Sequence, residues 1–234
     1  MNMKKFGLLI FALAIILGVL VSDFFSFGKV TEPFLSFAIG NKVIGSGNVV
    51  TEKREMTDFS ALDVGGFFQV EVAPGKEYGL EVSADDNLVP LIRTEVRHGT
   101  LYIESEGSFR NSGRPRLVIT APNIEKISAS GASRVSMTEI GNRALTVEGR
   151  GASKIDLSGN TTDLLIDASG ASSVNAAGLG TMTAKVEASG ASKVTVTATN
   201  GLNLSSSGAS KIFYSGDPVD VKKRTTGAGS IGKR

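Results

Sequence analysis

The sequence predicts an all-β fold in which the chain winds into a parallel β-solenoid with about 19 residues per coil. Three observations lead to this fold class. A short motif of small residues recurs at nearly constant spacing. Apolar residues stand at fixed positions on both sides of each copy, and apolar and polar residues alternate within the repeat. A period of two indicates strands, and a unit of this length that already holds two strands leaves no room for a helix.

The repeated motif is clearest at Ala188–Val194, which reads ASGASKV. Its central glycine recurs at intervals of 20, 19, 20, 18 and 19 residues, at Gly131, Gly151, Gly170, Gly190, Gly208 and Gly227. The segment ALDVGGFFQVEV fits the same pattern when it is aligned on Gly66. Glycine adopts backbone conformations that other residues resist, so each of these glycines is predicted to form a structural turn at the corner of a coil.

Apolar residues stand at fixed positions on both sides of each glycine. Four positions before it stand Ile127, Val147, Ile166, Val186 and Leu204, and four positions after it stand Val135, Ile155, Val174, Val194, Ile212 and Ile231. Strands that turn these residues inward and stack about 4.8 Å apart would share one apolar interior. The interior corner is also predicted to hold a ladder of mutually hydrogen-bonded serines, namely Ser133, Ser153, Ser172, Ser192 and Ser210.

The pattern is less regular toward the N-terminus. Phe59–Ala73 is predicted to be an earlier coil, and Arg116–Thr120 is predicted to be a further strand. Tyr78–Ser105 holds two strand-like stretches, YGLEVSA and TLYIES. Asp85–Val96 lies between those stretches and contains Pro90, so we expect it to bulge out of a coil and to include one helical turn.

The C-terminal tail reads VKKRTTGAGSIGKR and is basic. Lys223 stands in an apolar column, and Lys233 stands in the column six positions after the glycine. The open end of a solenoid exposes unpaired strand edges, which charged residues protect from association. We therefore expect the tail to be a cap, with a membrane-facing or polymer-binding patch as the alternative.

The N-terminus has the features of an export signal. Lys4 and Lys5 precede Phe6–Val21, an uncharged and mostly apolar run of 16 residues. As a helix this run would be about 24 Å long, slightly short for a membrane span. The best candidate for a cleavage site, Ser26-Phe27-Gly28, is weak. A cleaved signal peptide and an uncleaved anchor in the inner membrane both stay open.

The chain is accordingly divided into three parts. Residues 1–28 are the signal peptide or signal anchor, residues 29–44 are a linker without a clear period, and residues 45–234 are the solenoid domain. Either form of the signal places the domain outside the cytoplasm, on the periplasmic or extracellular face of the cell envelope, and an anchor would make the membrane a partner. The sequence has no cysteine, which excludes disulfides and an acylated lipoprotein N-terminus.

Composition and spacing point away from catalysis and from bound cofactors. The formal net charge of +2 gives no electrostatic reason to expect a nucleic-acid partner. His98 is the sole histidine and is expected at the surface, with no residue pattern that would make it part of a catalytic triad. Asp85 and Asp86 are expected at a turn or a helix N-cap rather than in a calcium or acid–base site. We expect no catalytic residue, no metal site and no cofactor.

One column is a candidate for a surface that binds a ligand. The positions three residues after the glycines include four cations, which would lie in one outward column with about 5 Å between adjacent coils. This basic stripe consists of Arg134, Lys154, Lys193 and Lys211, with Ser173 between them. Such a stripe suits an acidic polysaccharide or an anionic lipid. The interpretation that we favour is local neutralisation by an acidic column three residues before the glycines, formed by Glu148, Asp167 and Glu187.

Three stretches carry a resemblance to a known family, namely GSGNVVTEKREMTDFSALDVGGFFQVEV, EVSADDNLVPLI and the SGAS repeats. Over roughly Ile44–Lys233, they resemble the exported bacterial proteins called putative autotransporter adhesin, head GIN domain. The resemblance implies a single-stranded right-handed β-helix at the cell envelope and offers no catalytic residues. Many members carry a lipoprotein cysteine that is absent here, so the attachment of this chain must differ.

The expected function is that of a non-catalytic structural, adhesive or ligand-binding module of the cell envelope. Its partner would be a glycan, a cell-wall polymer or a protein surface. One alternative is a polysaccharide lyase or hydrolase, which would need clustered carboxylates rather than regular polar rows. Another alternative is a scaffold that self-assembles through its solenoid ends, against which the basic cap argues. The oligomeric state stays open.

Overall fold

The structure is a computed structural model that describes residues 42–110 and 113–234. The expected signal or anchor at residues 1–28, and most of the expected linker at 29–44, lie outside the described residues. Val43–Arg234 forms a compact unit that contains the entire hydrophobic core cluster found in the described chain, as expected of a domain that folds independently. None of the helices described is both long and apolar enough to cross a membrane.

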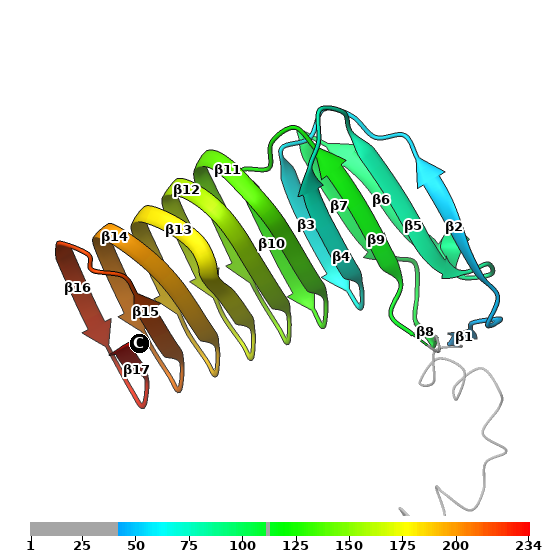
Figure 1. The fold of residues 1–234 in the computed structure, drawn as a ribbon. Coiled ribbons are helices and arrows are strands. Elements are labelled where there is room, and N and C mark those ends of the chain that lie inside the picture. The colour runs from blue at the N-terminus through cyan, green and yellow to red at the C-terminus, as the bar shows by residue number, and fades with distance from the viewer. Residues whose placement is uncertain (1–41, 111–112) are drawn as a thin grey trace, which may run out of the picture. The chain divides into compact units, whose positions relative to one another are not determined.

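The unit is a β-solenoid, as the repeat predicts, with two faces built from stacked strands (Figure 1). We call the strands that precede the corner glycines the first face and those that follow them the second face. The first face contains β3 (Ala61–Gly66), β10 (Lys126–Gly131), the C-terminal parts of β11 (Arg134–Gly149), β12 (Lys154–Ala168), β13 (Ser173–Ala188) and β14 (Lys193–Ser206), and β16 (Asp220–Thr225). The second face contains β4 (Gln69–Pro74), the N-terminal parts of β11 to β14, β15 (Lys211–Ser215) and β17 (Ser230–Lys233).

All strand pairs within these two stacks are parallel. On the second face, Arg134 pairs with Lys154, and the register continues through Ser173, Lys193, Lys211 and Ser230. The partners are 20, 19, 20, 18 and 19 residues apart. Equivalent positions of successive coils therefore lie in straight columns, with about 4.8 Å between neighbours.

The order of the strands in space differs from their order in the sequence at the N-terminal end. The coil of β3 and β4 pairs directly with β10 and β11, although a long segment separates them in the chain. That segment supplies β7 (Thr100–Ser105) and β9 (Arg116–Ala121), which pair in parallel with the opposite edges of β3 and β4. The expected coil at Phe59–Ala73 is therefore present, but the segment after it adds further strands beyond this coil.

Antiparallel strands close the N-terminal end. β6 (Ile92–Arg97) pairs with β7, while β5 (Gly79–Asp85) pairs with β9 and with β2 (Val49–Arg54). The expected bulge at Asp85–Val96 is only partly correct, because its second half is β6 and a 3-10 turn, η1 (Val89–Leu91), provides the expected helical turn. The short strands β1 (Val43–Ile44) and β8 (Phe109–Arg110) pair with each other, so the last residues assigned to the linker join the fold.

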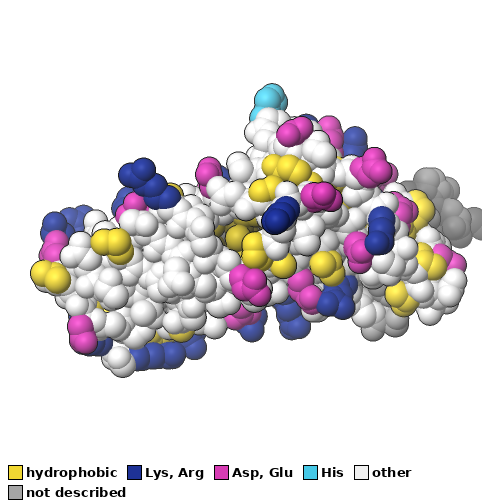
Figure 2. All heavy atoms as spheres, turned by 45° about the horizontal axis from the view of Figure 1, so that its top comes forward, with side chains coloured by type: hydrophobic (Ala, Val, Ile, Leu, Met, Phe, Trp, Pro, Cys, Tyr) yellow, Lys and Arg dark blue, Asp and Glu magenta, His cyan; other side chains and the backbone are white. Residues whose placement is uncertain are grey.

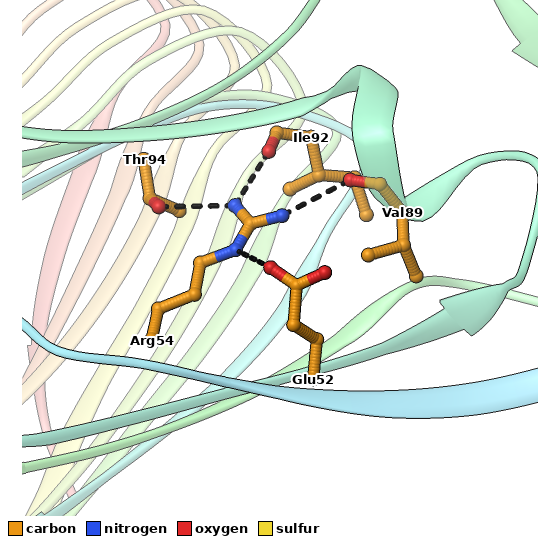
Figure 3. Close-up of polar contacts among 5 residues, drawn as sticks. All are labelled: Glu52, Arg54, Val89, Ile92 and Thr94. Atoms are coloured by element: carbon orange, nitrogen blue, oxygen red, sulfur yellow. Dashed lines mark hydrogen bonds and ion pairs between the residues drawn. The ribbon is translucent and has the colours of Figure 1, made fainter.

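Arg54 fastens β2 to the turn that precedes β6 (Figure 3). Its guanidinium donates hydrogen bonds to the carbonyl oxygens of Ile92 (2.6 Å) and Val89 (3.1 Å) and to the Thr94 hydroxyl (3.0 Å). The Glu52 carboxylate accepts a fourth bond at 2.7 Å and balances the charge. Only 14% of the Arg54 side chain is exposed, so these bonds are shielded from water and hold the N-terminal strands together.

The corner glycines combine a left-handed backbone with close stacking on one another. Gly190 has a φ of 71°, and a Cβ atom placed on it would lie 2.7 Å from the carbonyl oxygen of Gly170 in the neighbouring coil. Such a contact is shorter than real Cβ atoms make, so only glycine fits both the conformation and the space. Positive φ values also occur at Gly66, Gly131, Gly151, Gly170, Gly208 and Gly227.

The corner serines are buried, but the predicted hydroxyl-to-hydroxyl ladder along the column is wrong. Ser192 and Ser210 donate instead to backbone carbonyl oxygens of the neighbouring coil, those of Ala168 (3.1 Å) and Ala188 (2.9 Å). Ser153 and Ser172 hydroxyls have no hydrogen-bond partner among the described residues. The carbonyl oxygens at the end of the first face, rather than the next serine, are thus the acceptors for Ser192 and Ser210.

The C-terminal end carries the expected basic residues over the last apolar layer. Lys223 donates a hydrogen bond to the Tyr214 hydroxyl at 2.8 Å, with its Nζ atom 4.5 Å from the centre of the ring. Lys233 pairs with Asp217 at 2.7 Å. Within the described chain, β16 pairs only with β14 and β17 only with β15, so both strands leave one edge unpaired. Charge on such edges disfavours strand-to-strand association.

Candidate functional site

The structure brings the four cations of the basic stripe into one column of the second face. Arg134 and Lys154 pair directly, Ser173 follows, and Lys193 and Lys211 pair directly on the far side of it. All four cationic side chains are exposed. They occupy alternate positions to the buried Val135, Ile155, Val194 and Ile212, whose burial fixes the outward direction of their neighbours.

The acidic column does not neutralise the stripe, and this expectation is wrong. Glu148 pairs instead with Lys126 at 2.6 Å and with Arg150 at 3.0 Å, and Glu187 pairs with Lys185 at 2.8 Å. These partners lie on the first face or at the corner, because a side chain reaches its neighbours in the same face more readily than a column around the turn. The hydrogen bond from Lys126 is the main reason why the pKa of Glu148 is lowered.

Neutralisation of the stripe is partial and comes from its own face. Lys154 pairs at 3.1 Å with Asp156, two residues further along the same strand. For Arg134, Lys193 and Lys211, the described part of the chain provides no carboxylate within 4.0 Å. The stripe therefore presents three uncompensated cations on a regular, rigid surface.

Two aromatic residues extend the stripe at its ends, and the repeat pattern did not identify them. At one end, the Arg114 guanidinium stacks 3.6 Å from the centre of the exposed Phe67 ring and donates to the carbonyl oxygen of Ala132. Partial burial, and then the nearby charge of Arg134, lower the pKa of Arg114. At the other end, Lys193 and Arg234 lie 5.8 and 4.3 Å from the centre of the Phe213 ring. Arg114 comes from an irregular segment, where column alignment has no register to follow, whereas Phe67 directly follows the aligned Gly66.

The acidic residues considered for catalysis or metal binding lie where β5 ends, with Asp85 as its last residue and Asp86 in the turn that follows. Asp86 accepts hydrogen bonds from the Ser46 hydroxyl (2.5 Å) and the Asn48 amide (3.0 Å), and these bonds lower its pKa. The Asp85 carboxylate is buried and accepts a bond from the backbone of Gly47 at 3.2 Å. His98 is exposed in the tight turn between β6 and β7. Across residues 42–110 and 113–234, no three acidic, histidine or cysteine side chains gather as a metal site would require.

Comparison with known proteins agrees with this architecture. A solved structure described as a putative adhesin from Bacteroides fragilis shares 20% of its sequence with this chain, with a TM-score of 0.70 over 82% of this chain and 100% of that one. A second structure, described as a putative lipid binding protein from Parabacteroides distasonis, is 19% identical, with a TM-score of 0.50 over 83% and 100% of the two chains. At these identities the similarity concerns the fold. The comparison with curated proteins gives no match.

Family membership rests on the sequence itself. The family described as "Putative auto-transporter adhesin, head GIN domain" matches residues 58–218. The matched segment runs from just before β3 to just after β15, and so contains the whole basic stripe but not β16 and β17. The chain belongs to the head GIN domain family of putative auto-transporter adhesins, as the resemblance of its sequence implies.

Proposed function

We propose that this chain is an exported, non-catalytic module of the cell envelope that binds an acidic polysaccharide along the basic stripe. The observation that carries the proposal is the lack of carboxylate partners for Arg134, Lys193 and Lys211 in the described chain. Uncompensated cations on a surface attract a polyanion, whereas paired cations contribute little.

The geometry of the second face suits an extended polymer. Its columns run across the strands, so cations recur along a straight line at multiples of about 4.8 Å. A chain with regularly spaced carboxylates or sulfates can contact several of these cations at once, and the linked contacts strengthen one another. The aromatic rings of Phe67 and Phe213, next to cations at the two ends, offer apolar surface to the faces of sugar rings.

The proposed location rests on the N-terminal sequence and on the family. The run Phe6–Val21 behind Lys4 and Lys5 would direct the domain out of the cytoplasm, and an uncleaved form would hold it at the membrane. We also propose right-handed coils, the hand that parallel crossover connections adopt almost without exception. Regular rows of Ser, Thr, Lys and Asn on the faces support a binding surface more than an enzyme active site.

A binding survey of the Val43–Arg234 domain tests the proposal. Immobilised domain is presented to envelope fractions and to an array of neutral and acidic glycans, alongside the variant R134A/K193A/K211A. The control variant K53A/R93A/R97A removes the same number of positive charges, but from residues that are paired with carboxylates at the N-terminal end. Retention of acidic glycans by the wild type and the control, with loss in the stripe variant, is expected. Equal retention by all three would overturn the proposal.

A further inference from the structure

The first face carries two adjoining grooves, on the side of the solenoid away from the basic stripe. The larger has a volume of about 470 Å³ and crosses β11, β12, β13, β14 and β16. The smaller has a volume of about 420 Å³ and lies over the last coils. Both are lined by Lys185, Asn203 and Lys222, so the two grooves form one continuous depression.

The surface that lines the larger groove is mostly apolar and includes Leu145, Leu164 and Leu202, although two aspartates stand in one of its outer columns. The register places Ala144, Asp163, Thr183, Gly201 and Asp220 side by side. Ala144 and Gly201 leave the surface hollow at their positions. In the next column stands Leu165, whose residue surface is 39% exposed. A large apolar side chain in a hollow of this kind favours contact with an apolar group of a ligand.

The smaller groove is basic and offers hydrogen-bond donors at its centre. Asn203 and Ser205 occupy the middle strand, and neither side chain forms a hydrogen bond within the described residues. Lys222 and Arg224 flank them in β16. Lys222 has only a loose ion pair with Asp220, at 3.5 Å, and Arg224 has no carboxylate partner in the described chain. Lys185, on the other side, is paired with Glu187.

The charge of the surrounding chain reinforces this groove. Residues 185–234 contain eight Lys and Arg against three Asp and Glu, whereas residues 42–184 contain fourteen against eighteen. The last coils therefore carry a formal net charge of +5 and the preceding part carries −4. Figure 2 shows dark-blue basic side chains along the whole domain, whereas the magenta acidic ones are fewer toward the left end, where β16 and β17 lie in Figure 1. An anion is attracted to this end of the domain.

We propose that the two grooves together bind an anionic amphiphile with a phosphate headgroup and a single acyl chain. The headgroup lies over Asn203 and Ser205, between Lys222 and Arg224, and the acyl chain lies over Leu165 in the larger groove. A plain anion would leave the apolar floor uncovered, and a neutral apolar ligand would leave the cations unused. This site is on the first face and shares no residue with the basic stripe, so a test of one proposal does not decide the other.

The test measures binding of three probes to the Val43–Arg234 domain by titration calorimetry, below the micelle concentration. Oleoyl lysophosphatidic acid has both parts of the ligand, glycerol 3-phosphate has only the headgroup, and oleoyl lysophosphatidylcholine has the same chain with a neutral headgroup. We expect the first to bind at least about tenfold more tightly than either of the others, a difference of about 1.4 kcal/mol. Equal binding of glycerol 3-phosphate would show a plain anion site, and equal binding of lysophosphatidylcholine would show an apolar site. Either result overturns the proposal.

Variants locate the site. Leu165→Asp and the pair K222A/R224A should each weaken lysophosphatidic acid about tenfold or more. The matched controls are Ile44→Asp, an exposed apolar residue at the other end of the domain, and K53A/R97A, two paired cations at that same end; both should bind as the wild type does. If Leu165→Asp lowers the thermal stability, Leu165→Ala replaces it. Unchanged binding in the groove variants would overturn the proposal.

Discussion

Replacement of Gly190 by alanine tests whether stacked corners hold the solenoid together. The residue has a φ of 71°, and its added methyl group would lie 2.7 Å from the oxygen and 3.1 Å from the nitrogen of Gly170. The left-handed conformation costs an L-residue about 1–2 kcal/mol. The overlap involves backbone atoms that cannot rotate away, and overpacking of this kind adds about 1–3 kcal/mol. The free energy of unfolding should fall by about 2–5 kcal/mol in total.

Gly47→Ala is the matched control for that prediction. Gly47 has a similar φ of 82°, but no other atom lies within 4 Å of the added Cβ, so this variant measures the conformational cost alone. Both variants of the Val43–Arg234 domain are unfolded in urea and followed by circular dichroism. We expect Gly190→Ala to lose at least about 1 kcal/mol more than Gly47→Ala. Equal losses would refute the reasoning that glycine is needed for contact between coils.

Other contacts give three further expected outcomes. Arg54→Lys keeps the charge but loses the planar fork, and should speed hydrogen exchange in β2 and η1, by local destabilisation of about 1–3 kcal/mol, with no change in β14. Glu148→Gln removes a carboxylate whose pKa is lowered from 4.5 mainly by the hydrogen bond from Lys126. That pairing stabilises the fold above pH 4.5 and is lost as the pH falls through the lowered pKa, so the variant should lose less stability on acidification than the wild type, as urea midpoints will show. Ser210→Ala should lower the free energy of unfolding in urea by about 1–2 kcal/mol, because the Ser210 hydroxyl donates a hydrogen bond to the Ala188 carbonyl oxygen. Ser153→Ala should leave the free energy of unfolding nearly unchanged, because the Ser153 hydroxyl has no partner among the described residues.

The fold of the repeat-containing part can be predicted from the sequence, because its contacts join equivalent positions of successive coils. Once Gly190 is aligned with Gly170, the pairing of Val194 with Val174 and the inward or outward direction of each neighbour follow from the two-residue period of a strand. The exposed column of Arg134, Lys154 and Lys193 follows in the same way. Parallel strands of one repeat have a single register in which all apolar positions are buried together.

The N-terminal end cannot be read in this way. Nothing local to Ala61–Gly66 shows that it pairs with β10 on one side and β7 on the other, because that order depends on contacts between distant segments. The antiparallel strands β5 and β6 have the same alternation as parallel ones, so the sequence does not reveal their direction.

The ion pairs also cannot be predicted from the alignment of the repeats. Alignment places Glu148 and Lys154 on either side of a corner but does not give the reach of their side chains across it. The structure shows that Glu148 pairs with Lys126 in its own face and that Lys154 pairs with Asp156 in its own strand, so neither ion pair crosses the corner. This is why the sequence suggested a neutralised stripe, whereas the described chain leaves most of the stripe uncompensated.

The most direct test of the central claim is a titration of the Val43–Arg234 domain with polygalacturonate, with neutral dextran as the reference polymer. The account predicts that polygalacturonate binds, that dextran does not, and that R134A/K193A/K211A weakens binding about 10- to 150-fold, from three contacts of about 0.5–1 kcal/mol each. Binding should also weaken as salt is added, because the contacts are exposed to solvent. Polygalacturonate affinity that is the same in the wild type and in this variant would contradict the claim that the stripe is the binding surface.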